Sequence, residues 1–577
     1  MPGSADFVQR AVHALEAGGL AVWVKRALVV DAIIGLALFY LIHEFRGLAT
    51  SQAMDQAQIG RHFASGDGFK TSFVRPRAVG QLRKAGKDVR RAIWSDTYNA
   101  PLPPVIDAIA LRMVKSHWKM TPRDIVYAGD KAIAVIAILF FLGSVLILYF
   151  TARRLFDHRL ALLGCGLVFF CDAFWQYSLS GLPQMFLLCL FNATVYVLVR
   201  AVETEYAGGR TYVWLGGAGV GFGFMALSHA LTIWMFVPML IFAALFFRPR
   251  GRAALIVLAA FTILYAPWLV RNFAVCGNPG GVAIYSVFDL VNHTEAGHMR
   301  RVELDLGGQG PATFGHKVIN NFIGQFGRIF EYLGWNSVAP LFFVALLHLF
   351  RRPETRVIQW MMLAMWLGAV IGMAVYGMHD EHGVAANQLH LLFVPIMICF
   401  GLAFLLVQWN RLSIDIALAR TGFLAGLYLV CGVPMLCTIL TSSNKSGIHW
   451  PPYVPPYISV LNDWMTPQEV VASDMPWAIA WYADRPSLWV PETVKAMADL
   501  NDYNVLGLPI NGLYLTPVSG SQNTLSDILK GEYKDWATVI LRSVDIQKMP
   551  LKSATLLGLE NECIFFSDHD RQHPSVK

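Results

Sequence analysis

Charged side chains are scarce in this 577-residue chain, in which Asp, Glu, Lys and Arg make up 15% of the residues and hydrophobic types 55%. A water-soluble protein of this length carries far more charge on its surface, so that class is excluded. Strict alternation of apolar and polar residues is also lacking. The sequence therefore predicts a mainly α, polytopic membrane protein whose spanning helices satisfy their own backbone groups.

Motifs for cofactor chemistry are scarce as well. The eight cysteines form no CxxC pair, and six fall within predicted spans, which favours packing residues over a disulfide framework. The chain has no P-loop, zinc finger or recognisable Ser-His-Asp arrangement. The glycine-rich stretch 216–224 lies inside a span, so close helix packing through Gly217 and Gly221 is favoured over nucleotide binding. No nucleotide cofactor is expected.

Long apolar runs, by contrast, recur through the first three quarters of the chain. A run of roughly 18 residues crosses about 30 Å of hydrocarbon as a helix. We predict about eleven spans, near 27–45, 132–150, 160–177, 182–199, 213–229, 231–247, 253–270, 338–350, 357–376, 389–407 and 422–440.

Arginine-rich loops set the predicted orientation. Five short loops with arginines fall on the same side of this map as Lys25 and Arg26, which flank the first span. By the positive-inside rule that side of the plasma membrane is cytoplasmic and holds the N-terminus. Residues 46–131 and 271–337 then form long outer loops. The net charge of +7 follows from this topology, and no nucleic-acid partner is expected.

The two ends of the chain differ from the spanning region. Apolar residues at helical spacing from Phe7 to Leu15 predict an amphipathic helix on the cytoplasmic membrane face, within a segment 1–26. After the last span, a proline-rich connector precedes the strand-like runs EVVASD, SLWVP, GLYLTP, ATVILRS and CIFFSD, with a helical LSDILKGEYKDW between two of them. This pattern predicts a small α/β domain over residues 441–577, outside the membrane.

An acidic residue shortly after the first span is the leading functional candidate. In MDQAQIGRHFASGDGF, the apolar positions suit a helix that rests on the membrane and ends at Gly66. Such a helix would hold Asp55 at the water boundary, where a carboxylate can act as a general base. An exposed helix-start acid without a catalytic task explains these residues equally well.

Four features in one order resemble the C-type glycosyltransferases of family 39, the bacterial group of protein mannosyltransferase-like and aminoarabinose transferase-like enzymes. They are a first span followed by Asp55, YNAPLPPVIDAIA before the second span, PWLVRNFAVCGNP leaving the seventh, and a C-terminal domain outside the membrane. The resemblance covers about residues 27–440. It implies a C-type fold, a polyprenyl-phosphate sugar donor, a lipid, glycan or protein acceptor, contact with membrane lipids, and a catalytic role for Asp55.

Two positions depart from the family's pattern. Many members have a second acid directly after the first, where this chain has Gln56. Aminoarabinose-type members often read Lys-Pro-Pro-Leu where this chain reads Asn99-Ala100-Pro101-Leu102. The role of that lysine is unfilled locally, so a lipid A aminoarabinose transferase is not the expected identity.

A departing lipid phosphate requires a cation at the outer boundary. Arg271, where the seventh span meets the outside, is the first candidate, and Arg75 and His390 follow. For each of them the alternative is an interface-anchoring side chain. Asp172, in the outward third of the third span, is a candidate second carboxylate, although a structural acid is an equally good interpretation.

The outer loop GMHDEHG is the candidate metal site. His379, Asp380, Glu381 and His382 supply imidazole and carboxylate groups, both good ligands for a divalent metal. Adjacent loop residues seldom converge on one ion, so a solvated loop is favoured and metal dependence stays open.

The sequence leaves two other function classes open. A transporter or flippase for a lipid-linked or small polar substrate fits the same spans, although no internal repeat is apparent. A membrane scaffold whose outer domain binds a partner would leave Asp55 without a task.

Overall fold

The computed structural model describes residues 19–114, 121, 124, 126–289, 297–305, 310–381, 383–413, 416–442, 454–520, 533–540, 551–557 and 563–572. The chain divides into two compact units, residues 1–45 with 441–445 and residues 46–440 with 446–577. In the first unit, α2 (Gly19–Phe39) continues as the π-helical η1 (Tyr40–Glu44). The amphipathic helix predicted near the N-terminus lies outside the described residues.

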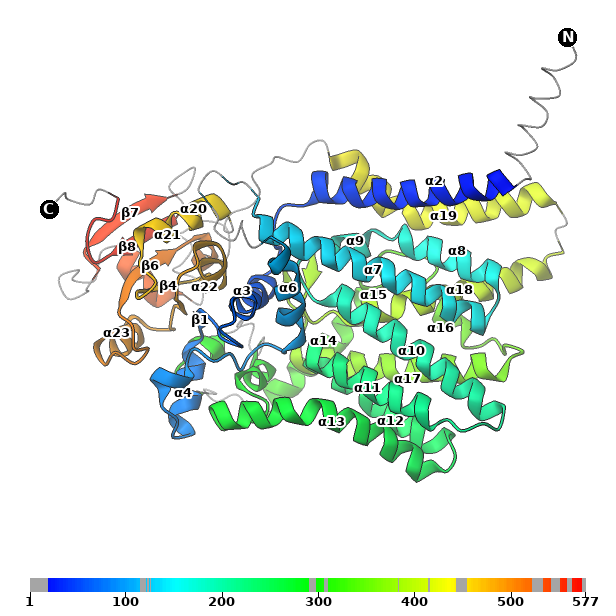
Figure 1. Cartoon of the computed structure of the whole chain (residues 1–577), viewed down its shortest axis with the longest axis horizontal. Helices are drawn as coiled ribbons and strands as arrows, with labels where there is room; N and C mark the ends of the chain where they lie inside the picture. Colours follow the sequence, from blue (N-terminus) through cyan, green and yellow to red (C-terminus); the bar gives the residue numbers. More distant parts are fainter. Residues whose placement is uncertain are drawn as a thin grey trace, which may run out of the picture. The chain divides into compact units, whose positions relative to one another are not determined.

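Long apolar helices dominate the second unit (Figure 1). Across the described chain, seven helices are long and apolar enough to cross a membrane, or eight if the bent pair α8 and α9 forms one span. In the second unit these are α7 (Ala128–Leu155), α8 (His158–Phe169) with α9 (Asp172–Leu179), α10 (Gln184–Tyr206), α13 (Arg250–Cys276), α17 (Pro353–Tyr376), α18 (His390–Arg411) and α19 (Ala417–Thr441). The shorter apolar helices are α11 (Tyr212–Ser228) and α12 (Ile233–Phe246), joined by η3 (Ala230–Thr232).

The predicted eighth span, 338–350, is not a full-length helix. Its helical part is α16 (Leu341–Ala345), five residues long, and turns make up most of the remainder. The segment packs closely on α18, where a Cβ atom at Gly401 would lie 2.2 Å from the carbonyl oxygen of Val338. Apolar composition alone therefore predicted too long a helix here, because burial against α18 does not require helical structure.

A six-stranded mixed sheet lies beside the helical region in the second unit. Its strand order is β1-β5-β4-β6-β8-β7, with β4 parallel to β5 and β6, and β8 antiparallel to β6 and β7. The strands are β1 (Phe73–Val74), β4 (Val470–Ser473), β5 (Ser487–Trp489), β6 (Ile510–Leu515), β7 (Ser553–Leu557) and β8 (Cys563–Ser567). The edge strand β1 comes from the first outer loop and pairs with β5, more than 400 residues away along the chain. Residues on both sides of the boundary predicted at 441 thus share one sheet.

Four of the five strand-like runs contain a strand, and the described part of the fifth, residues 537–540, is helical. ATVILRS begins with the short helix α24 (Ala537–Ile540), because Ala537 and Val539 pack into the core beneath the sheet. Periodicity cannot separate a short buried helix from a strand in so brief an apolar run. Most of LSDILKGEYKDW lies outside the described residues. The other elements of this region are α20 (Pro455–Ser459), α21 (Leu461–Trp464), α22 (Pro476–Ala478), η8 (Ile479–Ala483), α23 (Val494–Asp502), η9 (Pro517–Gly520) and η11 (Lys534–Trp536).

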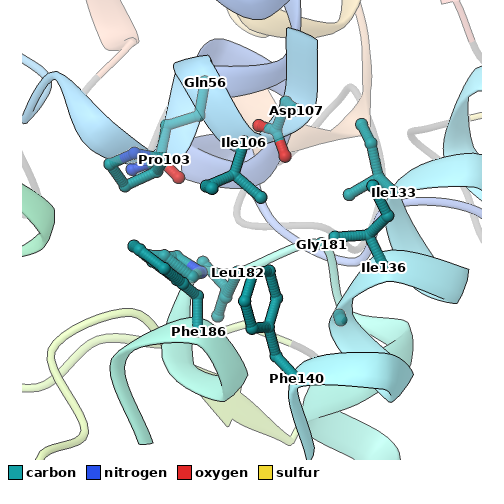
Figure 2. A pocket seen from close by; sticks show the side chains of 12 residues that line it. Gln56, Pro103, Ile106, Asp107, Ile133, Ile136, Phe140, Gly181, Leu182 and Phe186 are labelled. Atoms are coloured by element: carbon teal, nitrogen blue, oxygen red, sulfur yellow. The ribbon is translucent and has the colours of Figure 1, made fainter. Parts of the chain in front are cut away.

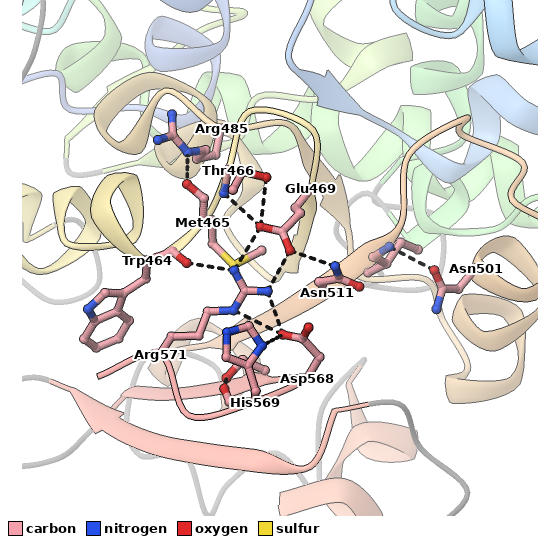
Figure 3. Close-up of polar contacts among 12 residues, drawn as sticks. Trp464, Met465, Thr466, Glu469, Arg485, Asn501, Asn511, Asp568, His569 and Arg571 are labelled. Carbon is pink, nitrogen blue, oxygen red and sulfur yellow. Dashed lines mark hydrogen bonds and ion pairs between the residues drawn. The ribbon is translucent and has the colours of Figure 1, made fainter. Parts of the chain in front are cut away.

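An arginine near the C-terminus joins the segments before β4 and after β8 (Figure 3). Arg571 donates two hydrogen bonds to the Glu469 carboxylate, at 2.7 and 2.9 Å, and another to Asp568 at 2.6 Å. Burial would raise the pKa of Glu469, but hydrogen bonds from Arg571 and Asn511 outweigh it and lower that pKa to about 2. Glu469 therefore stays ionised and holds the chain end against the sheet.

The two long loops contain mostly short helices. The first holds α3 (Ser51–Ser65), α4 (Pro76–Lys84), α5 (Val89–Ala92) and α6 (Leu102–Met113), and the second holds η4 (Val282–Phe288), η6 (Gly297–Arg300), α14 (Pro311–Gly327) and α15 (Ile329–Tyr332). A third loop forms the hairpin β2 (Asp380–Glu381) and β3 (Val384–Ala385). As predicted, Asp55 lies on a helix that ends at Gly66, whose φ of 92° suits glycine.

Candidate functional site

Asp55 is buried on α3, with only 1% of its surface exposed. Its Oδ2 atom accepts hydrogen bonds from Arg75 Nη2 at 2.6 Å and from Asn99 Nδ2 at 2.7 Å. Its Oδ1 atom accepts one from Gln58 Nε2 at 3.0 Å. The three donors stabilise the carboxylate in its ionised form and fix its orientation.

Arg75 forms an ion pair with Asp55 and lies against two aromatic rings. Its guanidinium carbon lies 3.6 Å from the centroid of the Tyr98 ring and 4.2 Å from that of Phe73. A buried, paired guanidinium stacked in this way holds the neighbouring carboxylate in place. Arg75 also supplies the positive charge that the sequence left unfilled at position 99, because it and Asn99 donate to the same Asp55 oxygen.

Asp96 is a second buried carboxylate in this group. Its Oδ2 atom accepts the backbone N–H of Asn99 at 2.8 Å. Burial and the negative charge of Asp55 raise the pKa of Asp96 to about 6, against the opposing effect of Arg75. The group thus contains a second carboxyl group, that of Asp96, whose pKa of about 6 lies above the ordinary value.

Arg271 borders the same group from α13. Its Nη1 atom donates to the backbone carbonyl of Asp96 and, at 3.0 Å, to Asn272 Oδ1, and its guanidinium carbon lies 4.8 Å from the Trp268 ring centroid. The side chain is only partly buried, and no carboxylate lies within ion-pair distance of it in the described chain. Arg271 is therefore a partly buried cation without a direct ion-pair partner among the described residues, although the Asp96 carboxylate acts on it electrostatically.

Packing from distant segments positions α3. At its start, Ser51 donates from its backbone nitrogen and hydroxyl to the Glu381 carboxylate, at 2.7 and 2.6 Å. Farther along, Arg61 donates to the carbonyls of Ala480 and Trp481, at 2.6 and 2.8 Å. The helix that carries Asp55 is thus fixed by the hairpin β2–β3 and by the C-terminal residues.

His390 lies elsewhere, within a network of its own. Its Nδ1 atom accepts from Trp366 Nε1 at 3.0 Å, Nε2 lies 3.1 Å from Gln325 Oε1, and the ring stacks on Tyr332. Both ring nitrogens are engaged in this fully buried position, so His390 offers no free N–H to a phosphate. The structure does not bring His390 into the Asp55 group, and its predicted role as a phosphate ligand stays a prediction.

Asp172 and the GMHDEHG loop also stand apart from Asp55. Asp172 begins α9, and Gln176 Nε2 lies 3.5 Å from its Oδ2 atom. Asp380 pairs with Arg328 at 3.4 Å, and Glu381 is bound to α3, so their carboxylates have structural partners. The described residues contain no group of three or more His, Cys, Asp or Glu that could hold a metal ion, and His382 lies outside them. The metal requirement stays a prediction.

A small, mostly apolar cleft adjoins α3 on the side of Gln56 (Figure 2). Gln56 and Asp107 lie on one side of it, and Phe140 and Phe186 on the other. Burial raises the pKa of Asp107 well above its usual range, which favours the neutral acid. The cleft suits an apolar group with one hydrogen-bonding atom. Asp55 itself does not line this cleft.

Sequence reasoning missed Gln58, Asp96 and Asn99 as members of the Asp55 group. Gln58 and Asn99 lie within the family motifs and Asp96 lies two residues before one, so polar residues in and beside these motifs were the available signal. Their convergence could not be predicted, because it depends on how the segment after α5 folds back on α3.

Comparisons with known proteins agree with this architecture. Residues 124–270 match the family model described as dolichyl-phosphate-mannose-protein mannosyltransferase. No curated protein sequence matches the chain. The archaeal oligosaccharyltransferase AglB from Archaeoglobus fulgidus, in complex with an inhibitory peptide and a dolichol-phosphate, aligns with a TM-score of 0.53 at 11% identity, over 96% of this chain and 76% of AglB.

A second solved protein is similar along nearly its whole length. ArnT from Cupriavidus metallidurans bound to undecaprenyl phosphate aligns with a TM-score of 0.50 at 11% identity, over 94% of this chain and 98% of ArnT. Its apo state gives a TM-score of 0.51, also at 11% identity, with coverages of 95% and 98%. Structural similarity at 11% sequence identity establishes the fold alone. The chain therefore has a C-type glycosyltransferase fold, and the resemblance to family 39 that the sequence predicts is confirmed.

Proposed function

We propose that this protein is a membrane glycosyltransferase, which transfers a sugar from a polyprenyl-phosphate donor to an acceptor at the outer face of the plasma membrane. One observation carries the proposal. The buried Asp55–Arg75 pair and the unpaired cation Arg271 belong to one hydrogen-bonded group, joined through Asn99 and Asp96. A carboxylate and a guanidinium that belong to one hydrogen-bonded group are the two groups that the reaction requires.

Arg271 would hold the donor phosphate. Its guanidinium has no carboxylate partner in the described part of the chain, and charge-assisted bonds to phosphate are strong. As the sugar leaves, negative charge grows on that phosphate, and Arg271 would stabilise it. Because the Arg75 guanidinium is bound to Asp55, we assign it to positioning that carboxylate, which replaces its predicted role as a phosphate ligand.

Asp55 would orient and deprotonate the acceptor. A carboxylate has about four acceptor sites. Three are used by Arg75, Asn99 and Gln58, which leaves one on Oδ1 for an acceptor hydroxyl or amine. Entry of the acceptor then requires an opening of the loops above this buried group.

The nature of the donor and acceptor follows the solved relatives. AglB is solved with a dolichol-phosphate and a peptide, and ArnT with undecaprenyl phosphate, so a polyprenyl carrier is the proposed donor lipid. The acceptor is proposed as a lipid, glycan or protein, and the sugar as a hexose or pentose. A divalent metal cofactor stays a prediction.

We further propose eleven membrane crossings, with the N-terminus cytoplasmic and the C-terminal α/β region outside. Tyr332 stacks on His390, at the start of α18, whereas Arg352 donates at 2.9 Å to the carbonyl of Arg154, near the end of α7. Since α7 and α18 both end in arginines, which indicates a cytoplasmic boundary, residues 333–351 cross from outside to inside despite the short α16.

Steady-state kinetics of purified variants test these roles. With radiolabelled polyprenyl-phosphate sugars and a membrane extract as acceptor source, Asp55→Asn should lower kcat at least about 100-fold. Arg271→Gln should raise the KM for the donor, whereas Arg83→Gln, which removes an exposed charge from α4, should match the wild type. Undiminished turnover in both Asp55→Asn and Arg271→Gln would refute the assignment.

A further inference from the structure

A second group of basic side chains, two cations and one imidazole, is buried among the outer loops. Arg77 on α4, His298 on η6 and Lys317 on α14 are 4%, 2% and 6% exposed. Three basic side chains seldom share a buried region without anions, because an uncompensated charge is costly to remove from water.

The partners of these three residues are almost all neutral. Arg77 Nη1 donates to the Val302 carbonyl at 3.1 Å, and Lys317 Nζ to the Val287 carbonyl at 2.8 Å. Neither cation forms an ion pair within the described chain. Of the acids nearby, Glu492 is already paired with Arg301 at 2.6 Å. The other, Asp289, raises the pKa of Lys317, but burial outweighs it and lowers that pKa to about 8. Three cations, Arg77, Arg301 and Lys317, face these two acids, so the group keeps an excess of positive charge.

Several hydrogen-bonding atoms in this group have no partner. Both ring nitrogens of His298, and Nε of Arg77, are buried without a hydrogen bond to any residue that the structure describes. Burial lowers the pKa of His298, and the charges of Arg301, Arg77 and Lys317 lower it further against the opposing charge of Glu492, which places these side chains near a neutral ring. Buried polar atoms are normally satisfied, so unsatisfied donors in one place indicate a ligand.

The backbone segments around Arg77 lie in close contact with one another. The helix α4 packs against η6 and η4. A Cβ atom at Gly80 would lie 1.7 Å from the Val302 carbonyl oxygen, the same oxygen that accepts from Arg77. Glycine at position 80 is therefore needed to bring Arg77 and η6 together.

The segment η4 connects this group to Asp55. Tyr285 stacks on the Arg77 guanidinium at 4.3 Å, and its neighbour Ser286 donates to the Tyr98 hydroxyl at 3.4 Å. Tyr98 in turn covers Arg75, the partner of Asp55. We infer that Arg77, His298 and Lys317 form a second oxyanion site, which binds a phosphate group carried by the acceptor. The identity of the ligand as an acceptor rests on the proposed transferase function, but the oxyanion site does not.

Binding of inorganic phosphate tests the oxyanion site without any turnover. Phosphate should raise the thermal unfolding midpoint of the purified full chain, and the same rise is expected for Arg83→Gln, which removes an exposed charge from α4. Arg77→Gln, Lys317→Gln and His298→Gln should each weaken phosphate binding at least tenfold, and Arg77→Lys should restore part of it. A response in Arg77→Gln and Lys317→Gln equal to that of the wild type would overturn the site, as would a response lost in Arg271→Gln alone.

Two further experiments identify the molecule that carries the bound phosphate group. If the acceptor carries it, phosphatase treatment of the membrane extract should raise the KM for acceptor at least tenfold in the wild type, with the KM for donor unchanged. Equal transfer to treated and untreated extract would contradict the acceptor assignment. A stabilising response to vesicles containing phosphatidic acid, absent with phosphatidylcholine alone and with inorganic phosphate, would assign the site to membrane headgroups and also contradict it.

Discussion

Asp55 combines burial with charge by accepting hydrogen bonds from three different segments of the first loop. Its carboxylate is 1% exposed and lies 2.6 Å from the Arg75 guanidinium. Such a pair is strongly coupled, because removing either partner leaves the other charge buried and unpaired. The coupling energy between Asp55 and Arg75 is measured from stability, and it therefore reports the structural role of Asp55 separately from its catalytic role.

We predict that Arg75→Gln lowers the free energy of unfolding by about 3–5 kcal/mol, since it leaves the Asp55 charge without its partner. The double variant Asp55→Asn/Arg75→Gln should recover much of that loss. Denaturant unfolding in detergent gives the cycle of free energies. If the two single effects simply add, the ion pair contributes no coupling energy and this account of the pair is wrong.

Asp96 should make stability depend on pH near neutrality. Its native pKa of about 6 lies above the ordinary value of 3.8, so the native state binds the proton more tightly than the unfolded state. Stability from this group therefore rises as the pH falls through 6 and is lowest above it. Asp96→Asn should raise the unfolding midpoint at pH 8, by the equivalent of about 1–3 kcal/mol, and this advantage should shrink as the pH falls below 6 and disappear below 3.8. A constant difference across this range would contradict the raised pKa.

For single residues, the sequence predicts which side chains could take part in catalysis better than it predicts which residues they contact. Asp55 and Arg271 were both identified from their position beside a span, and the structure brings them into one group. His390 was a plausible ligand by position, but its two ring nitrogens are engaged by Trp366 and Gln325. Such contacts between helices distant in sequence are set by packing, which a single sequence does not display.

Among the helices, glycine allows α11 to approach its neighbours closely. A Cβ atom at Gly219 would lie 2.4 Å from the Val257 carbonyl oxygen on α13, and one at Gly221 would lie 2.2 Å from Thr194 Oγ1 on α10. The packing role predicted for Gly221 is therefore confirmed, whereas Gly217 has a looser contact, 3.3 Å from Val197. Close approach without large side chains is the usual basis of helix association in membranes.

We predict that Gly219→Ala destabilises the protein by about 1–3 kcal/mol, because its new methyl group meets backbone that cannot move aside. The matched control is Gly216→Ala on the same helix, where the new atom would lie 3.8 Å from Ile256, an ordinary contact. Thermal unfolding in detergent should show a lower midpoint for Gly219→Ala only. Equal midpoints for the two variants would mean that α11 and α13 can separate without loss.

Hydropathy located the elements well where helices cross in one regular run. It failed at 338–350, where an apolar segment packs on α18 with only five helical residues. It also failed at ATVILRS, since a short buried run is compatible with either helix or strand. In both cases tertiary packing, which lies outside local sequence pattern, decided the structure.

Over the whole molecule, the sheet joins the first loop to the C-terminal residues. The pairing of β1 with β5 could not be predicted, because the two-residue strand β1 has no recognisable sequence signal. The fold class, by contrast, followed from composition, topology and the order of four short motifs. Those features reflect constraints that act on the entire chain, and they survive at low sequence identity.

The attachment of the C-terminal residues to the sheet should depend on pH, because it depends on the ionised Glu469 carboxylate. Its native pKa of about 2 lies below the ordinary 4.5, so its contribution to stability is present above pH 4.5 and is lost as the pH falls towards 2. Arg571→Gln should therefore lower the unfolding midpoint at pH 7, and its deficit relative to wild type should shrink between pH 4.5 and pH 2. A deficit that does not change with pH would contradict the proposed ion pair.

The central claim is that the protein transfers a sugar from a lipid phosphate at the outer face, with Asp55 as the base. The most direct measurement places wild type and Asp55→Asn in proteoliposomes with labelled polyprenyl-phosphate sugar and acceptor extract, and follows both transfer and sidedness of the label. We predict label on the acceptor for the wild type and at least about 100-fold less for Asp55→Asn. Translocation of intact donor by both proteins, without transfer by either, would contradict the account and identify a transporter.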